Sequence, residues 1–144
     1  MGSVVRQTVL DAPVDQVWEY FEHPASWSEW DPDIVAVYEE ADPGIADGKS
    51  WDIAMKAPKQ GRLEFSQVVP GKGFTWQVVA LGGAIRGIGN FGFSSAARKD
   101  HTDFTYEFQM KGLLGRGLWL LGRKAVVKGV DDGLSNLVNE FSQE

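Results

Sequence analysis

The chain has 144 residues, of which 43% are hydrophobic and 24% charged, and its formal net charge is −6. This length suits one domain with its own core, so we expect residues 1–144 to form a single domain. The negative charge argues against nucleic acid as a partner, and the absence of cysteine excludes disulfides and thiolate metal sites. Because a chain without cysteine suits a reducing compartment, we expect a cytoplasmic protein.

The first part of the chain predicts one strand followed by two short helices. Residues 4–10 are apolar and β-branched, which favours a strand, and Pro13 ends it. Residues 14–22 place apolar side chains at helical spacing, and Pro24 stops that helix. A second short helix or turn is expected over residues 25–30.

Six further strands are predicted where the apolar residues change from helical spacing to alternation. They span residues 34–38, 49–56, 62–69, 73–81, 84–95 and 102–110. Because short turns containing glycine, proline or aspartate connect them, consecutive strands should pair antiparallel. In the last strand Phe104, Tyr106 and Phe108 alternate with polar residues, which is typical of a sheet with one buried face. Glycines crowd strand 84–95, where we expect bends and bulges that curve the sheet.

A long helix over residues 113–141 should cover the buried face of this sheet. Its apolar residues form two stripes that a straight helix cannot direct at one sheet, so we expect a bend within residues 122–129. Four glycines lie near one angular position of the helix: Gly115, Gly122, Gly129 and Gly133. They leave room for a ligand, permit the bend or allow close packing on the sheet.

These elements predict an α+β fold, in which a curved seven-stranded antiparallel sheet surrounds a long C-terminal helix and two short helices follow the first strand. Residues 8–13 (TVLDAP), 17–18 (VW), 26–32 (SWSEWDP) and 74–76 (FTW) resemble signatures of the START/polyketide cyclase-like superfamily, also called SRPBCC or helix-grip. The resemblance covers nearly the whole chain. It implies a deep cavity between helix and sheet, which relatives use for lipids, sterols, polyketides, plant hormones or aromatic substrates.

We therefore expect the protein to bind or carry a small hydrophobic molecule, because its inner face is aromatic and has few titratable groups. The candidate ligand-binding residues are Trp27, Trp30, Trp51, Met55, Gln67, Trp76, Phe91, Phe93, Phe104, Tyr106, Phe108, Leu118 and Gly122. For any single inward aromatic, plain core is the favoured interpretation, and only the set as a whole favours a cavity. Trp27 and Trp30 either plug the end of the core or form a cavity mouth. Gln67 shares the strand parity of Leu63 and Phe65, which predicts that it points inward.

Two alternatives remain open at this point. One is a cyclase or dehydratase that works by positioning its substrate, with Tyr106 as a candidate acid or hydrogen-bond donor and with no metal or cofactor. The other is a lipid-binding protein that contacts membranes through Leu118 to Leu121 within the basic segment 111–128, although a simple solvated face also explains that segment. Either a monomer or a homodimer is compatible with the sequence.

Overall fold

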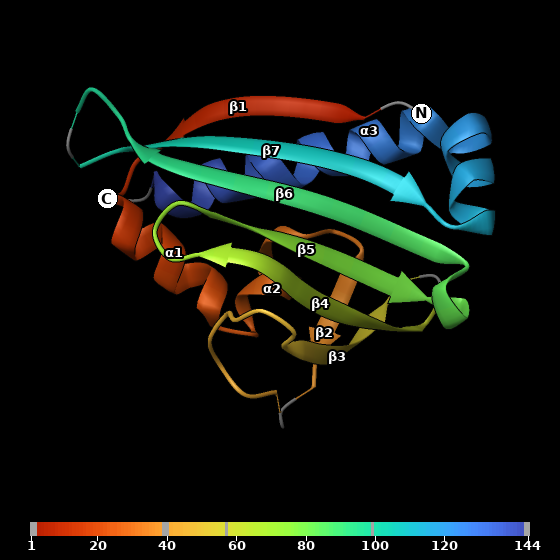
Figure 1. Ribbon diagram of the computed structural model, residues 1–144. Coiled ribbons are helices and arrows are strands. Elements are labelled where there is room, and N and C mark those ends of the chain that lie inside the picture. The colour runs from red at the N-terminus through yellow and green to blue at the C-terminus, as the bar shows by residue number, and fades with distance from the viewer. Residues whose placement is uncertain (1–2, 39–40, 57, 99, 143–144) are drawn as a thin grey trace.

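The computed structural model describes residues 3–38, 41–56, 58–98 and 100–142. Its strands form one antiparallel sheet in the order β1-β7-β6-β5-β4-β3-β2 (Figure 1). The strands are β1 (Val4–Leu10), β2 (Ile34–Val37), β3 (Ser50–Met55), β4 (Gln60–Val69), β5 (Gly73–Ala80), β6 (Ile85–Ser95) and β7 (Thr102–Lys111). The helices are α1 (Val14–Glu22), α2 (Ser26–Trp30) and α3 (Leu113–Phe141), and a 3-10 turn, η1 (Leu81–Gly83), joins β5 to β6. The predicted α+β fold is confirmed, with seven curved strands and a long C-terminal helix.

All three helices gather on one face of the sheet. α3 lies behind β6 and β7 in Figure 1 and packs against β7, β1 and β6. α1 contacts β6, whereas α2 contacts both β2 and α3. Along β5 every second side chain is buried, as expected for a strand with one covered face. The inward side chains of the sheet are therefore enclosed beneath the helices.

Aromatic rings fill the core where α1 and α2 meet the sheet. Trp27 and Trp30 of α2 are 0% and 1% exposed, so they plug the core and form no open mouth. The Trp27 indole stacks on Phe91 with ring centroids 6.2 Å apart, and its Nε1 donates a hydrogen bond to the Phe21 carbonyl oxygen at 2.8 Å. Burying such large rings stabilises the fold by several kcal/mol, roughly 2 kcal/mol for each ring.

α3 bends at Gly122, within the predicted range. Gly122 has φ −123° and ψ 25°, which interrupts the helical backbone. Figure 1 shows the first turns of α3 running at an angle to the remainder of the helix. The two apolar stripes of the sequence thus belong to two differently directed helical segments, as the spacing requires.

The glycines of α3 serve different purposes along the helix. A Cβ added to Gly133 would lie 3.2 Å from the Trp30 ring, and one on Gly115 would lie 3.7 Å from the Arg86 backbone nitrogen. These two glycines allow α3 to approach its neighbours closely. Gly122 meets nothing within 4 Å at its Cβ position, and Gly129 meets only the Asp33 carboxylate at 3.7 Å. Close packing, bending and open space therefore all occur, each at its own glycine.

The expected bulges in β6 are absent from this strand, and that prediction was wrong. Its pairing with β5 runs without a shift from Gly73 opposite Gly92 to Ala80 opposite Ile85. Instead, the glycines of β6 admit rings from neighbouring strands. A Cβ on Gly89 would overlap the Trp76 indole, and one on Gly87 would lie 2.9 Å from the Phe108 ring.

Candidate functional site

A pocket of about 290 Å³ lies between α3 and the inner face of the sheet. Its lining residues are Asp31, Asp33, Ile34, Met55, Pro58, Trp76, Val78, Ile85, Gly87, Tyr106, Phe108, Met110, Leu118, Gly122, Ala125, Val126, Gly129 and Val130. The volume is at the lower end of the range of roughly 300–1,000 Å³ that is typical of ligand pockets. Most of the wall is aliphatic or aromatic, so an occupant would be held mainly by burial of its apolar surface.

The fold leaves this space because α3 carries no bulky side chain at two places above the sheet. Gly122 and Gly129 both line the pocket, one at the bend and the other about two turns beyond it. From the sheet side, Trp76 and Phe108 form the wall, with ring centroids 5.9 Å apart. The bent helix and the glycines together leave a hollow that the side chains do not fill.

Besides the indole nitrogen of Trp76, three polar side chains line the pocket. Asp31 and Asp33 come from the connection between α2 and β2, and Tyr106 comes from β7. Asp31 Oδ1 accepts a hydrogen bond from the Asp33 backbone N–H at 2.9 Å, which fixes the turn that contains Pro32. The Asp31 backbone N–H in turn donates to the Trp27 carbonyl oxygen at 3.1 Å and caps α2. The carboxylate is therefore held in place by the end of the helix.

Burial changes the acidity of these groups. Asp31 is 9% exposed, and desolvation raises the pKa of its carboxyl group to about 7, against the smaller opposing effect of the Asp33 backbone N–H. Burial also raises the pKa of Tyr106 well above its usual value, and the nearby Asp31 and Asp33 carboxylates add to that rise. At neutral pH the Tyr106 hydroxyl is consequently protonated, whereas the Asp31 carboxyl group is present in both its protonated and its ionised form.

The structure brings six of the predicted ligand-binding residues to the pocket: Met55, Trp76, Tyr106, Phe108, Leu118 and Gly122. The other six aromatic candidates, Trp27, Trp30, Trp51, Phe91, Phe93 and Phe104, are buried in the core and lie outside the pocket lining. Alternation along a strand identifies which side chains point inward. It does not tell an inward side chain that faces another ring from one that faces a cavity.

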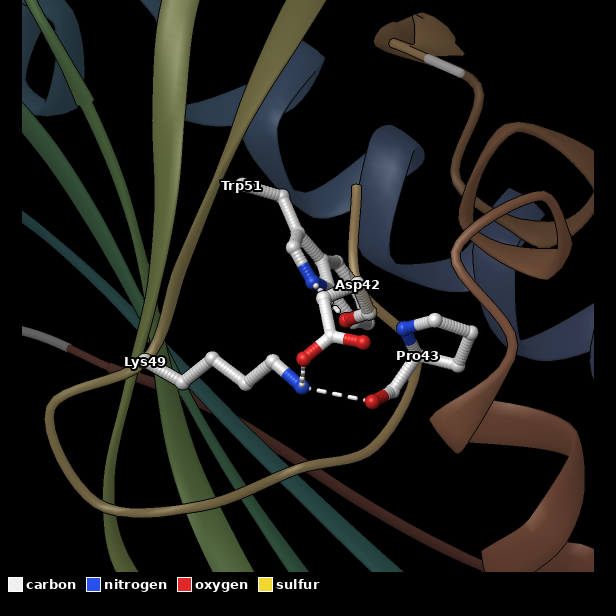
Figure 2. A network of polar contacts seen from close by, with 4 residues as sticks. All are labelled: Asp42, Pro43, Lys49 and Trp51. Carbon is white, nitrogen blue, oxygen red and sulfur yellow. Dashed lines mark hydrogen bonds and ion pairs between the residues drawn. The ribbon is translucent and has the colours of Figure 1, made fainter. Parts of the chain in front are cut away.

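Trp51 shows how a predicted pocket residue is used for structure instead. Its indole Nε1 donates a hydrogen bond to the Asp42 carbonyl oxygen at 2.8 Å (Figure 2). Lys49 Nζ binds the same segment through Asp42 Oδ2 at 3.3 Å and the Pro43 carbonyl oxygen at 2.5 Å (Figure 2). The ring and the ammonium group together fasten the chain before β3, away from the pocket.

Gln67 points away from the interior, so the prediction that it faces inward was wrong. It is exposed, its φ is 51°, and the pairing of β4 with β5 shifts between Ser66 and Val69. Its Oε1 accepts a hydrogen bond from the Thr75 hydroxyl at 3.2 Å on the outer side of the sheet. A bulge reverses the parity of the residues after it, and the alternation of Leu63 and Phe65 therefore does not extend to Gln67.

The sequence analysis missed Asp31 and Asp33, the two carboxylates of the pocket. Both stand beside Pro32 directly after the helix that ends at Trp30, and in the sequence Asp31 and Pro32 served only as part of the family signature over residues 26–32. A usable signal was present, since two acids flank a proline between a buried tryptophan and a strand. Such residues sit at an element end, where functional side chains are often positioned by a rigid scaffold.

Searches for two other kinds of site gave no candidate within the described ranges. No group of three or more histidine, aspartate or glutamate side chains is arranged to hold a metal ion in those ranges. Among the same residues, no helix is both long and apolar enough to cross a bilayer.

Comparison with known proteins gives one family match and many structural matches. The sequence model of the family described as "Polyketide cyclase / dehydrase and lipid transport" matches residues 1–142. No curated protein matches the chain. A hypothetical protein from Helicobacter pylori is similar in structure, with TM-score 0.76, 10% identity, and coverage of 97% of this chain and 88% of that one.

Two further structures show the same likeness of fold. A protein from Mesorhizobium loti has TM-score 0.71 and 15% identity, with 96% of this chain and 95% of that chain covered. The di-domain ARO/CYC protein BexL from the BE-7585A biosynthetic pathway also has TM-score 0.71 and 15% identity, over 96% of this chain and 46% of that one. At these identities the likeness concerns the fold alone.

Proposed function

The chain belongs to the polyketide cyclase/dehydrase and lipid transport family, and from this premise we propose that it binds a small, mainly apolar molecule in the pocket beneath α3. The observation that carries the proposal is the pocket itself, about 290 Å³ in volume and walled by Trp76, Phe108 and Val130 among other apolar groups. If each heavy atom takes roughly 30 Å³, the share of a water molecule in the liquid, about nine or ten atoms fit. A compact ring system or a short acyl chain has this size.

A pair of glycine substitutions tests this proposal. Gly129→Leu places a side chain at the pocket wall, whereas Gly117→Leu places the same side chain on α3 outside the pocket lining, where a Cβ meets nothing within 4 Å. Both changes remove a helix glycine, so both should raise helix stability by about 1 kcal/mol. We expect 1-octanol to raise the melting temperature of the wild type and of Gly117→Leu but not that of Gly129→Leu. Equal shifts in all three proteins would contradict the proposal.

The polar groups favour a second candidate, an enzyme that transfers protons in an apolar site. Asp31 has a carboxyl pKa of about 7, where one group can both donate and accept a proton, and Tyr106 supplies a hydroxyl in the same pocket. Cyclisation and dehydration of a polyketide-like substrate need such transfers. If this candidate is correct, Tyr106→Phe lowers turnover of a cyclising substrate at least tenfold with the fold intact; unchanged turnover removes Tyr106 from that role.

The first segment of α3 favours contact with a membrane as an additional property of a lipid-binding protein. Five leucines on it are exposed: Leu113 (86%), Leu114 (49%), Leu118 (45%), Leu120 (79%) and Leu121 (93%). We call them the leucine surface. Arg116, Arg123 and Lys124 flank it, and Leu118 also lines the pocket. An apolar surface bordered by basic residues is the usual composition of a helix that lies in a bilayer interface.

A further inference from the structure

The charge of the pocket lining is one-sided. Asp31 and Asp33 contribute carboxyl groups, and the lining includes no lysine, arginine or histidine. The basic residues of α3 that adjoin lining residues in the sequence are all exposed: Arg123, Lys124 and Lys128. Lys128 pairs with Asp132 on the helix surface instead. A ligand that brings an anion into this pocket therefore meets like charge and no counter-ion among the lining residues.

Both carboxylates face the space that α3 leaves open. A Cβ on Gly129 would lie 3.7 Å from Asp33 Oδ2, so this oxygen points at the helix where its side-chain volume is missing. Asp31 uses Oδ1 to accept the Asp33 N–H, and no hydrogen bond is found for its Oδ2 among the described residues. The pocket thus offers acceptor oxygens with free capacity at its polar part.

Tyr106 completes this polar part from the opposite side. Its side chain is 3% exposed, lines the pocket, and makes no hydrogen bond with any residue in the described ranges. Within the described residues the fully enclosed side-chain atoms without a hydrogen-bond partner are Trp30 Nε1 and Trp76 Nε1, so the Tyr106 hydroxyl borders the open space of the pocket and can accept a hydrogen bond from a ligand. The other polar group of the wall, Trp76 Nε1, is buried without a hydrogen-bond partner among the described residues and lies against β6, where a Cβ added to Gly89 would be 2.5 Å away.

Resting on the proposed function, we infer that the pocket selects an apolar molecule that ends in a protonated amine and discriminates against one that ends in a carboxylate. The ammonium group donates hydrogen bonds to the Asp31 and Asp33 carboxylates and to the Tyr106 oxygen, while the apolar body lies against Trp76 and Phe108. A charge-assisted hydrogen bond in an enclosed site is stronger than a neutral one. The ammonium also restores the charge balance that the lining lacks.

Three probes with the same eight-carbon chain test this inference: octylamine, 1-octanol and octanoate. Isothermal titration calorimetry near pH 7.5 should give the lowest Kd for octylamine, at least tenfold below that of 1-octanol, with octanoate weakest. Asp31→Asn should bring the Kd of octylamine close to the Kd of 1-octanol measured with the same variant. Asp103→Asn, at an exposed position of β7, removes the same formal charge and should leave the order as in the wild type.

The possible failures are distinguishable. If no probe binds the wild type, or if Gly129→Leu binds all three as well as the wild type does, the proposed function itself is wrong. If probes bind in the pocket but octanoate binds as tightly as octylamine, only the amine selection is wrong. The same conclusion follows if Asp31→Asn keeps the full preference for octylamine. Asp33→Asn tests the preference for octylamine at the second carboxylate. Thermal unfolding of each variant verifies that it is folded.

Discussion

Asp31 links the pocket to the stability of the whole fold, because its carboxyl group is buried and no cation of the described residues contributes to its pKa. Its pKa is raised from 3.8, the ordinary value of an aspartate carboxyl group, to about 7 in the folded protein. The folded state therefore holds a proton that the unfolded chain has already released between these pH values, and stability falls as pH rises from about 4 to about 7. The charged group facing Asp31 is the Asp33 carboxylate. Tyr106 lies nearby on β7 as a neutral hydroxyl, and neither group offsets the negative charge of Asp31.

This linkage predicts that Asp31→Asn stabilises the protein at neutral and alkaline pH. The amide oxygen can still accept the Asp33 N–H, while the buried charge is gone. At about 1.4 kcal/mol for each pKa unit, we expect a gain of about 2 to 4 kcal/mol in the free energy of unfolding near pH 8. The gain should shrink toward pH 4. Urea unfolding of both proteins across this range measures it, and a difference that stays constant with pH would show that Asp31 titrates normally.

Single residues also mark where sequence reasoning stops. Gln67 was placed inward because Leu63 and Phe65 before it are, yet one bulge with φ 51° reverses its direction. Nothing in the local pattern announces that bulge, since its cause is the pairing with β5. Asp31 was overlooked for a related reason, because its raised pKa follows from burial in the folded protein, which the local sequence does not show.

Elements were predicted more fully than residues, because their signal is a repeat summed over many positions. Alternation gave the strands to within about two residues at each end, and helical spacing gave α1 and α3. The bend of α3 followed from two stripes that face different ways, and Gly122 indeed interrupts the helix. The bulges expected in β6 are absent, because the glycines of this strand leave room for rings of neighbouring strands. Both the close approach of a ring and the curvature of a strand favour glycine, so a glycine in the sequence does not distinguish them.

The role of the β6 glycines yields a prediction with an internal control. Gly89→Ala forces the new methyl group into the Trp76 indole, while Gly92→Ala places it 3.7 Å from the Thr105 Cβ, an ordinary contact. We expect Gly89→Ala to lower the free energy of unfolding by about 1 to 3 kcal/mol, as is usual for overpacking, and Gly92→Ala to have almost no effect. Chemical denaturation measures both. If the two variants lose similar stability, loss of strand flexibility is the cause and ring clearance is not.

At the scale of the whole molecule, the sequence predicted the enclosure between sheet and helix but not which part of it is empty. An aromatic face beneath a glycine-containing helix implied a cavity, and the pocket lies there. Its position depends on how rings pack: the rings around Trp27 and Phe91 fill one part of the enclosure, while Gly122 and Gly129 leave the other part open. Packing of this kind is decided by three-dimensional fit, which no residue pattern in the chain specifies.

The leucine surface is an exposed apolar surface at the edge of the pocket, whose lining includes Leu118. Contiguous exposed apolar side chains of this kind mark interaction sites. Two copies of the chain joined through this surface would bring Arg116, Arg123 and Lys124 near their equivalents, which like charges oppose. Anionic lipid headgroups would instead complement these residues, in a chain whose net charge of −6 otherwise repels them. Arg123 lies over the Trp119 ring at 5.3 Å, close to the leucines.

Vesicle sedimentation tests whether the leucine surface binds to a membrane. We expect binding to vesicles that contain phosphatidylglycerol, weaker binding to pure phosphatidylcholine, and a decrease with added salt. The double variant Leu120→Ser/Leu121→Ser should bind at least tenfold more weakly, because each buried leucine contributes roughly 2 kcal/mol. Val35→Ser removes a similarly exposed apolar side chain from β2 and should bind as the wild type does. If the double variant keeps its vesicle binding, or instead converts a wild-type dimer into a monomer in light scattering, the leucine surface does not face a bilayer.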